Sequence, residues 1–551
     1  LCVARAALPL ALQEAAEREP PAACVSSFGF GGANAHLVLR AASAAERSDE
    51  VPTPDREAAL PPLVLSAATD AALAALAQRW RAHVAEAIDA PDALCAAIET
   101  ADGRRTRQAT QAVLAARKPT GLLKALDALA DGRSDPRVTS CRAQTPEARG
   151  IALVFSGNGA QWGGMGQWLL TDPLGADRFN EAAAAISAAG GPDLAALMAA
   201  PDREERLQDS LAAQSLLWAQ QVAAACSIVA QLEARGLAPR LVMGHSVGEV
   251  AAACAAGCLR LRDAARLIVN RACAVRPLRD SGAMAALLTD RDTAAALMAE
   301  VGAPDSLALA ADNSPRSVTV SGDSAAVDAL AAIARSRRIA LRKLPVPFPY
   351  HAPALDGVED ALRAAAAGLA PQHGQLRLIS TVTGARIAPV ALTDDHWWRN
   401  ARQPVRFREG VETAIAEGCG LFIEIGPRPV LGAYVRDCLS ASSATGLCLS
   451  SEPGPGREDA ATSPAALAAI AQGHVQASGD TACAARRPPH AGHAGLPRYP
   501  WQRRKYRAAP SASGGDLYGL VPLKSGRARS ALLGHRDRAG CGPWLGSIDA
   551  A

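Results

Sequence analysis

The sequence lacks an excess of charge of one sign and lacks an apolar run long enough to cross a membrane. Its 551 residues carry a net charge of +3, and 20% of them are charged. The arginine-rich stretch at 502–507 is too short to bind a polyanion, so we expect no nucleic-acid partner. No apolar stretch reaches the roughly 18 residues that a membrane span needs, and Leu1 does not begin a signal peptide. We therefore expect no membrane partner and a cytoplasmic location.

Closely spaced cysteine pairs are absent as well. The 13 cysteines are scattered without a Cys-x-x-Cys pair, and Cys254 and Cys258 lie among alanines. This pattern is typical of small, reduced core residues. We expect neither a disulfide framework nor a metal site, and no bound cofactor.

The most informative segment that is present is Gly244-His245-Ser246-Val247-Gly248-Glu249, between the apolar run 241–243 and the alanine-rich stretch 250–257. A strand, a Gly-x-Ser-x-Gly turn and a helix form the pattern of a nucleophile elbow. The glycines allow a turn too tight for a Cβ, and the helix N-terminus can stabilise a developing oxyanion. Ser246 is therefore the predicted nucleophile of an enzyme that does acyl chemistry, either an α/β-hydrolase or an acyltransferase.

Further motifs decide between these two classes. They are Val154–Trp162, Arg271 at 25 residues after Ser246, Phe348–Pro353, Trp398–Phe407 and Ile423–Pro427. Together with the elbow, these segments resemble the malonyl/acyl-CoA:acyl-carrier-protein transacylases, in the same order and over residues 150–430. The resemblance identifies an acyltransferase.

The flanking segments resemble parts of modular type I polyketide synthases. Val25–Leu39 resembles the last strands of a ketosynthase, Leu496–Tyr506 the linker that follows an acyltransferase, and Leu532–Asp549 the first hairpin of a dehydratase. The expected parts are a ketosynthase C-terminal remnant (1–44), a ketosynthase–acyltransferase linker domain (45–149), an acyltransferase (150–440), a post-acyltransferase linker (441–510) and a dehydratase N-terminal stub (511–551). We expect neither end to be a natural terminus. The resemblance implies an acyl carrier protein and the neighbouring ketosynthase and dehydratase domains as partners.

The expected fold class is α/β. Short apolar strands at 151–155, 240–243 and 421–425 alternate with amphipathic helices, which favours a parallel, α/β-hydrolase-like sheet in a large subdomain. Residues 282–347 read as strands at 283–288, 318–322 and 339–343 with helices at 291–301 and 324–336, an order that suits a ferredoxin-like small subdomain. A small α/β linker domain precedes them, with strands at 63–66 and 108–115 and helices at 70–88 and 119–131.

The resemblance implies a catalytic role for five residues. Ser246 would attack the thioester of an acyl-CoA, and His351 would act as its general base. A backbone carbonyl orients the histidine in this family, and the matching position is Asn400. The backbone N–H groups of Val247 and Asn158 would hold the oxyanion. The acceptor would be the phosphopantetheine thiol of the carrier protein.

Other residues would bind the acyl group. A guanidinium binds a carboxylate through two parallel hydrogen bonds, so Arg271 is expected to select a malonyl group over acetyl. Gln161, Gln214 and Asn313 match polar positions that line the family's cleft. His245 points away from Ser246 in such a turn and is expected to pack or hydrogen-bond below the site.

The residues before His351 bear on the choice of acyl unit. His-Ala-Phe-His accompanies malonyl and Tyr-Ala-Ser-His accompanies methylmalonyl in the family, whereas this chain has Phe348-Pro349-Tyr350-His351. The ring of Tyr350 would fill the space that an α-methyl group needs. Val247, where methylmalonyl enzymes often carry glutamine, also favours malonyl-CoA as the substrate.

Two other classes of function remain open, besides transfer of methylmalonyl or acetyl. A thioesterase or esterase would also use Ser246 but would need a carboxylate to orient its histidine, and Asp394 or Asp395 with His396 could supply one. A non-catalytic docking scaffold is the third possibility. The presence of Ser246, His351 and Arg271 argues against a scaffold.

Overall fold

The computed structural model describes residues 22–28, 34–40, 60–142, 149–455, 463–475, 496–502, 535–536 and 544–545. The chain divides into two compact units, Leu1–Pro500 and Trp501–Ala551. In the second unit, β16 (His535–Arg536) pairs antiparallel with β17 (Trp544–Leu545); the rest of the predicted dehydratase stub lies outside the described residues. Near the start of the chain, β1 (Ala22–Phe28) and β2 (Asn34–Arg40) form an antiparallel hairpin.

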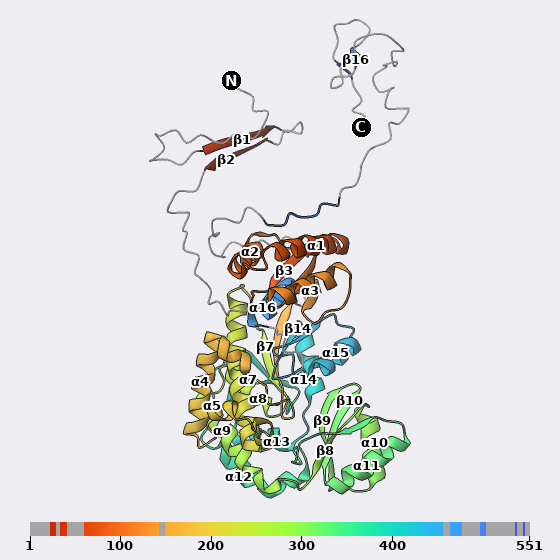
Figure 1. Cartoon of the computed structure of the whole chain (residues 1–551). Coiled ribbons are helices and arrows are strands. Elements are labelled where there is room, and N and C mark those ends of the chain that lie inside the picture. Colours follow the sequence, from red (N-terminus) through yellow and green to blue (C-terminus); the bar gives the residue numbers. More distant parts are fainter. Residues whose placement is uncertain are drawn as a thin grey trace. The chain divides into compact units, whose positions relative to one another are not determined.

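A six-stranded sheet forms the centre of the large subdomain (Figure 1). Its strands, in spatial order, are β13 (Ala385–Ile387), β12 (Arg377–Ser380), β7 (Leu241–Gly244), β6 (Gly150–Phe155), β14 (Cys419–Ile425) and β15 (Leu447–Ser450). All neighbours are parallel except the edge strand β13. A parallel sheet is covered on both faces, and the central strands β7, β6 and β14 are buried at every position.

Alternate residues of the central strands enter two separate cores. Leu153 and Phe155 of β6 face one helical layer, whereas Ala152 and Val154 face the other. The first layer consists of α4 (Pro173–Ala188), α7 (Ser210–Glu233), α8 (Gly248–Ala255), α9 (Leu261–Ala274) and α12 (Glu359–Ala366). The second consists of α14 (Phe407–Ala416) and α15 (Gly432–Ala441). Shorter helices complete the subdomain: α5 (Leu194–Ala199), α6 (Arg203–Arg206), α13 (Asp394–Arg402), η3 (Gln167–Thr171), η4 (Arg276–Leu278), η5 (Pro353–Val358) and η6 (Pro389–Ala391).

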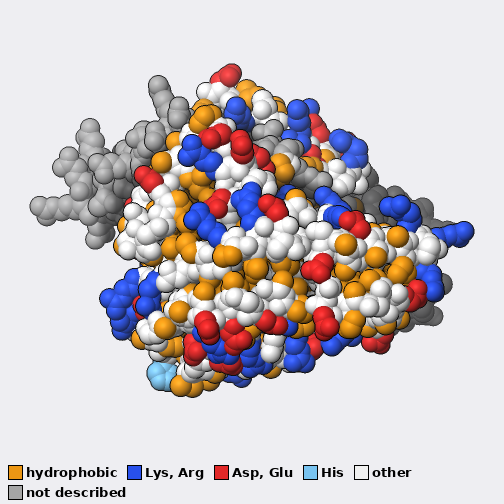
Figure 2. Space-filling model, turned by 90° about the horizontal axis from the view of Figure 1, so that it is seen from below, with side chains coloured by type: hydrophobic (Ala, Val, Ile, Leu, Met, Phe, Trp, Pro, Cys, Tyr) orange, Lys and Arg blue, Asp and Glu red, His pale blue; other side chains and the backbone are white. Residues whose placement is uncertain are grey.

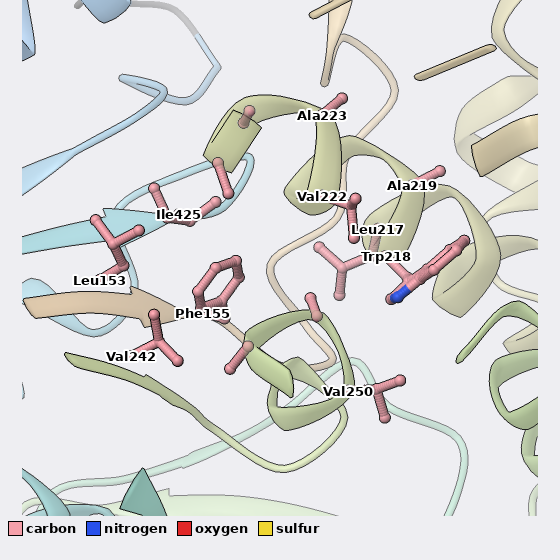
Figure 3. Close-up of a cluster of buried hydrophobic side chains, with 14 of the residues drawn as sticks. Leu153, Phe155, Leu217, Trp218, Ala219, Val222, Ala223, Val242, Val250 and Ile425 are labelled. Carbon is pink, nitrogen blue, oxygen red and sulfur yellow. The ribbon is translucent and has the colours of Figure 1, made fainter. Parts of the chain in front are cut away.

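The helix α7 is the main buried helix of this fold. Figure 3 shows its side chains Leu217, Trp218 and Val222 packed toward Phe155 of the sheet and Val250 of α8. Among the described helices, α7 alone is long and apolar enough to cross a membrane by length and composition, but 78% of its most apolar window is buried inside the protein. Its apolar character is therefore that of a core helix.

The small subdomain is a four-stranded antiparallel sheet with two helices. Its elements in chain order are β8 (Ala283–Leu287), α10 (Arg291–Val301), β9 (Leu307–Ser314), β10 (Ser317–Gly322), α11 (Ser324–Ser336) and β11 (Leu341–Lys343). The spatial order β11-β8-β10-β9 with a β-α-β-β-α-β connection is the ferredoxin-like arrangement. The sequence analysis missed β9, which joins this sheet to the large subdomain through hydrogen bonds between Asp312 N and Val405 O and between Val405 N and Ala310 O.

The linker domain is a three-stranded antiparallel sheet covered by helices. It contains β3 (Leu63–Ala67), α1 (Asp70–Glu86), α2 (Pro91–Arg104), β4 (Thr110–Leu114), α3 (Pro119–Ala130) and β5 (Val138–Arg142). The helix α16 (Pro464–Val475) packs against both α7 and the β4–β5 pair. The predicted boundary at residue 440 is therefore too early, because β15 completes the main sheet and α16 is part of the same body.

The charged surface is mixed in sign. Figure 2 shows Lys and Arg side chains interspersed with Asp and Glu on the face seen from below. Many exposed pairs are one helical turn apart, such as Arg206 with Asp202 and Arg408 with Glu412. Exposed pairs of this kind contribute little to stability.

The segment at 496–500 lies against the linker domain. Leu496 and Tyr499 pack on its core, and the Tyr499 hydroxyl accepts a hydrogen bond of 3.0 Å from Ala68 N. Trp501, which follows this segment, is 77% exposed.

This contact predicts a role in stability separate from chemistry at Ser246. Tyr499→Ala should lower the free energy of unfolding by about 1–3 kcal/mol, because it removes a hydrogen bond and a partly buried ring. Chemical denaturation would measure the loss, with Arg498→Ala, an exposed neighbour, as the control. A folded Tyr499→Ala variant whose Ser246 had lost its reactivity would contradict this separation.

Candidate active site

The turn between β7 and α8 places Ser246 at the end of a central strand. A Cβ at Gly244 would lie 2.2 Å from the backbone nitrogen of Glu249, and one at Gly248 would lie 2.5 Å from Phe155 O. Both positions therefore require glycine, as the sequence predicted. Ser246 itself has a φ of 54°, a left-handed conformation that costs a non-glycine residue energy and often marks a functional site.

His351 meets Ser246 from a different part of the chain. Its Nε2 atom is 2.7 Å from Ser246 Oγ, and the two residues are 3% and 7% exposed. His351 also has a positive φ of 60°. Burial, followed by the positive charge of Arg271, lowers the pKa of His351 to about 3. The imidazole is therefore neutral at pH 7 and can accept the serine proton.

The predicted partner of His351 Nδ1 was wrong by one helical turn. His351 Nδ1 donates to the backbone carbonyl of Gln403 over 2.8 Å, and not to that of Asn400. Asn400 lies inside α13, whereas Gln403 follows its last residue with a ψ of 160°. A residue before proline is pushed out of the helical conformation, so Pro404 turns the Gln403 carbonyl away from the helix. Pro404 is therefore the feature of the sequence from which the role of the Gln403 carbonyl could have been predicted.

Arg271 is a buried guanidinium with an uncommitted edge. It is 2% exposed, and its Nη1 donates to Asn400 Oδ1 over 2.6 Å. Its Nε and Nη2 atoms have no hydrogen-bond partner within the described structure. Burial lowers the pKa of Arg271, and the nearby Tyr350 and Glu249 raise it. A buried cation with two free, adjacent donors is suited to bind a carboxylate.

A buried carboxylate, that of Glu249, lies next to Asn400. Its Oε1 is 2.9 Å from His396 Nε2, and its Oε2 accepts from Thr381 N at 3.1 Å, from Thr381 Oγ1 at 3.0 Å and from Asn400 Nδ2 at 3.2 Å. His396 is thus a partner of Glu249 rather than of the catalytic residues.

The orienting carboxylate proposed for the hydrolase alternative is also misplaced. Asp394 and Asp395 pair with Arg363 at 3.4 and 3.1 Å on the surface. Since a backbone carbonyl occupies Nδ1 of His351, the carboxylate–histidine arrangement of a hydrolase triad is not formed here.

Tyr350 is held by polar groups rather than by packing alone. Its hydroxyl is 2.9 Å from both Ser210 Oγ and Gln214 Nε2. Burial raises the pKa of the Tyr350 hydroxyl, so the phenol stays neutral. The sequence analysis missed Ser210, which no local motif marks.

A cleft opens beside Tyr350, between the large subdomain and residues 345–348, which follow the small subdomain. Its lining includes Asn158, Gln161 and Tyr350. Gln161 Oε1 also accepts from Gly159 N over 2.8 Å, which fixes the loop after β6.

His245 and Asn313 form a hydrogen-bonded pair that supports the elbow. His245 Nε2 lies 2.9 Å from Asn313 Oδ1, and Asn313 Nδ2 donates to Thr319 Oγ1 over 3.0 Å. Asn313, which was predicted to line the cleft, is 1% exposed and is not among the residues that line the pocket beside Tyr350. The predicted hydrogen bond of His245 below the site is present.

Comparison with known families agrees with this geometry. Residues 152–474 match the acyl transferase domain family, and residues 8–110 match the ketoacyl-synthetase C-terminal extension. The crystal structure of the acyltransferase domain from module 8 of the salinomycin polyketide synthase is 30% identical, with a TM-score of 0.66, covering 75% of this chain and 95% of that one. The malonyl-CoA:acyl carrier protein transacylase of Xanthomonas oryzae is 28% identical, with a TM-score of 0.50, covering 56% and 96%.

Similar full-length proteins are polyketide synthases. The chain is 37% identical over 420 residues to the spectinabilin polyketide synthase system protein NorA' of Streptomyces orinoci, and 34% identical over 505 residues to polyketide synthase GfsA of Streptomyces halstedii. These matches cover 76% and 88% of this chain but only 11% and 6% of the relatives' lengths. The chain therefore belongs to the acyl transferase domain family, in the form found in polyketide synthases.

Proposed function

We propose that this chain transfers a malonyl group from CoA to the phosphopantetheine thiol of an acyl carrier protein, through a malonyl ester of Ser246. The observation that carries the proposal is the free Nε–Nη2 edge of Arg271, buried close to the Ser246–His351 pair. A malonyl group presents a carboxylate to such a fork, and an acetyl group does not.

The reaction follows from the contacts of His351. Its Nε2 takes the proton as Ser246 Oγ attacks the thioester carbonyl, and the CoA sulfur recovers that proton when the carbon–sulfur bond breaks. The carrier thiol then gives its proton to Nε2 and attacks the ester, and the Ser246 oxygen leaves with the proton. The Gln403 carbonyl keeps Nδ1 protonated throughout, and the N–H groups of Val247 and Asn158 would hold the oxyanion.

The fixed ring of Tyr350 supports a preference for malonyl over methylmalonyl. The acyltransferase domain of SpnD, 25% identical with a TM-score of 0.61, was solved with a 2-(pent-4-yn-1-yl)malonyl group, so a related domain holds a substituted malonyl group. Selection in this chain would then depend on its own side chains. Tyr350 is anchored by Ser210 and Gln214 and cannot move aside without breaking these bonds.

The proposed partners follow from the flanking matches. A ketoacyl-synthetase C-terminal extension before the acyltransferase supports a ketosynthase domain and a carrier protein of the same synthase as partners. A dehydratase domain after residue 511 remains a proposal from the sequence.

One incubation tests the function. The protein is mixed with equal amounts of malonyl-, methylmalonyl- and acetyl-CoA, and the acyl adduct is read by intact mass. A malonyl adduct should dominate and should move to an added carrier protein. Turnover to free acid would indicate a hydrolase, and no adduct with any substrate would indicate a scaffold. Equal methylmalonyl and malonyl loading would contradict the role of Tyr350.

The lowered pKa of His351 predicts the pH dependence of acylation. A general base works only when deprotonated, and an ordinary histidine loses activity as the pH falls through about 6.5. With a pKa of about 3, His351 stays neutral, so kcat/KM for malonyl-CoA should be flat from about pH 8 to about pH 5. Arg271→Ala removes one cause of the lowering and should move the acidic limb upward. If the acidic limb of the wild-type pH profile lay near pH 6.5, His351 could not be a general base with a lowered pKa.

A further inference from the structure

We propose that Asn400 is a positioning residue that keeps Arg271 oriented and uncommitted, and so determines the preference for an acyl group that carries a carboxylate. This inference rests on the proposed function and adds the residue that prepares Arg271 for its substrate.

The orientation of the Asn400 side chain is fixed by three hydrogen bonds. Its Oδ1 accepts from Arg271 Nη1 at 2.6 Å, and its Nδ2 donates at 3.2 Å to both Ser246 O and Glu249 Oε2. A flipped amide would turn its oxygen toward two acceptors and its NH₂ toward a donor. The amide therefore has one arrangement, and it links the nucleophile turn directly to the guanidinium.

The second observation is the separation of Glu249 from Arg271. Both oxygens of Glu249 are occupied by Thr381, His396 and Asn400, and Arg271 forms no ion pair within the described structure. Burial lowers the pKa of Arg271, and the charge of Glu249 opposes that lowering. The amide thus stands between the two charges, so that the carboxylate supports the guanidinium charge without occupying its donors.

The neutrality of Asn400 is the essential property. A carboxylate at this position would pair with Arg271 in a buried site, where charge pairs are strong, and would compete with the carboxylate of the substrate. An alanine would remove the acceptor of Arg271 Nη1, and the orientation of the guanidinium would no longer be fixed. Both changes remove the 3.2 Å hydrogen bond from Asn400 Nδ2 to Ser246 O, but they leave Ser246 Oγ, the His351 ring and the Gln403 carbonyl in place.

The test compares Asn400→Asp and Asn400→Ala with the wild type, using single-turnover acylation at varied malonyl-CoA and acetyl-CoA concentrations. For malonyl-CoA, kcat/KM should fall about 10-fold in Asn400→Ala and about 10²-fold in Asn400→Asp, mainly through KM. For acetyl-CoA, both variants should stay within about threefold of the wild type. Asn180→Asp makes the same chemical change at an exposed position of α4 and should leave the transfer of both acyl groups unchanged.

Two checks keep the outcome decisive. The rate at which phenylmethylsulfonyl fluoride modifies Ser246 should be unchanged in both variants, because this reaction reports whether the Ser246–His351 pair is intact. If Asn400→Asp does not fold, the comparison of Asn400→Ala with the wild type tests the proposal. Equal losses for malonyl and acetyl, or an unchanged preference, would overturn the role of Asn400 alone. A wild type that shows no preference for malonyl would overturn the proposed function and this inference with it.

Discussion

Ser246→Ala should abolish covalent loading from malonyl-CoA. The substitution removes the hydroxyl oxygen that lies 2.7 Å from His351 Nε2, and with it the atom that would form the ester. The fold should persist, because an alanine fits the same left-handed turn and only one hydrogen bond, worth about 1 kcal/mol, is lost. Intact mass after incubation with malonyl-CoA is the measurement.

The control for this experiment is a serine away from the elbow. Ser324→Ala, at an exposed position in α11 of the small subdomain, should load as the wild type does. A malonyl adduct on Ser246→Ala, mapped by peptide digestion to another residue, would show that Ser246 is not the nucleophile. A denaturation midpoint matching that of the wild type would confirm that loss of loading is chemical.

The central sheet could be predicted because its strands are buried on both faces. The run 151–155 is apolar throughout and 421–425 is apolar except for Glu424, and both lie between helices with a clear amphipathic pattern. The strand β9 was missed for the opposite reason. It ends in Asp312-Asn313-Ser314, polar residues that read as a loop but are buried where the small subdomain meets the large one.

The catalytic pair could be predicted from motifs, but its supporting residues could not. Gly244 and Gly248 indicate the turn, since only glycine fits at these two positions. The choice of Gln403 over Asn400 depends on where α13 ends, and helix ends are the least certain part of any such prediction. The contacts of Glu249 with Thr381 and His396 join residues more than 130 positions apart, and no local pattern encodes them.

Arg271→Ala should reverse the preference between malonyl and acetyl. The free Nε and Nη2 donors would form two charge-assisted hydrogen bonds with the malonyl carboxylate, each worth about 1.5–3 kcal/mol. Their loss should lower kcat/KM for malonyl-CoA by about 10²–10⁴-fold. Acetyl transfer should be retained or rise, because acetyl uses neither donor and the cleft no longer holds an unpaired buried charge.

The matched control lies on the same helix. Arg262 also belongs to α9, but its side chain is 73% exposed, so Arg262→Ala should leave both substrates unchanged. Competition between malonyl- and acetyl-CoA, scored by adduct mass on the wild type and both variants, gives the ratio directly. If Arg271→Ala lost acetyl and malonyl transfer equally while Ser246 still reacted with phenylmethylsulfonyl fluoride, Arg271 would act on both acyl groups alike. The carboxylate fork would then have to be sought elsewhere in the cleft.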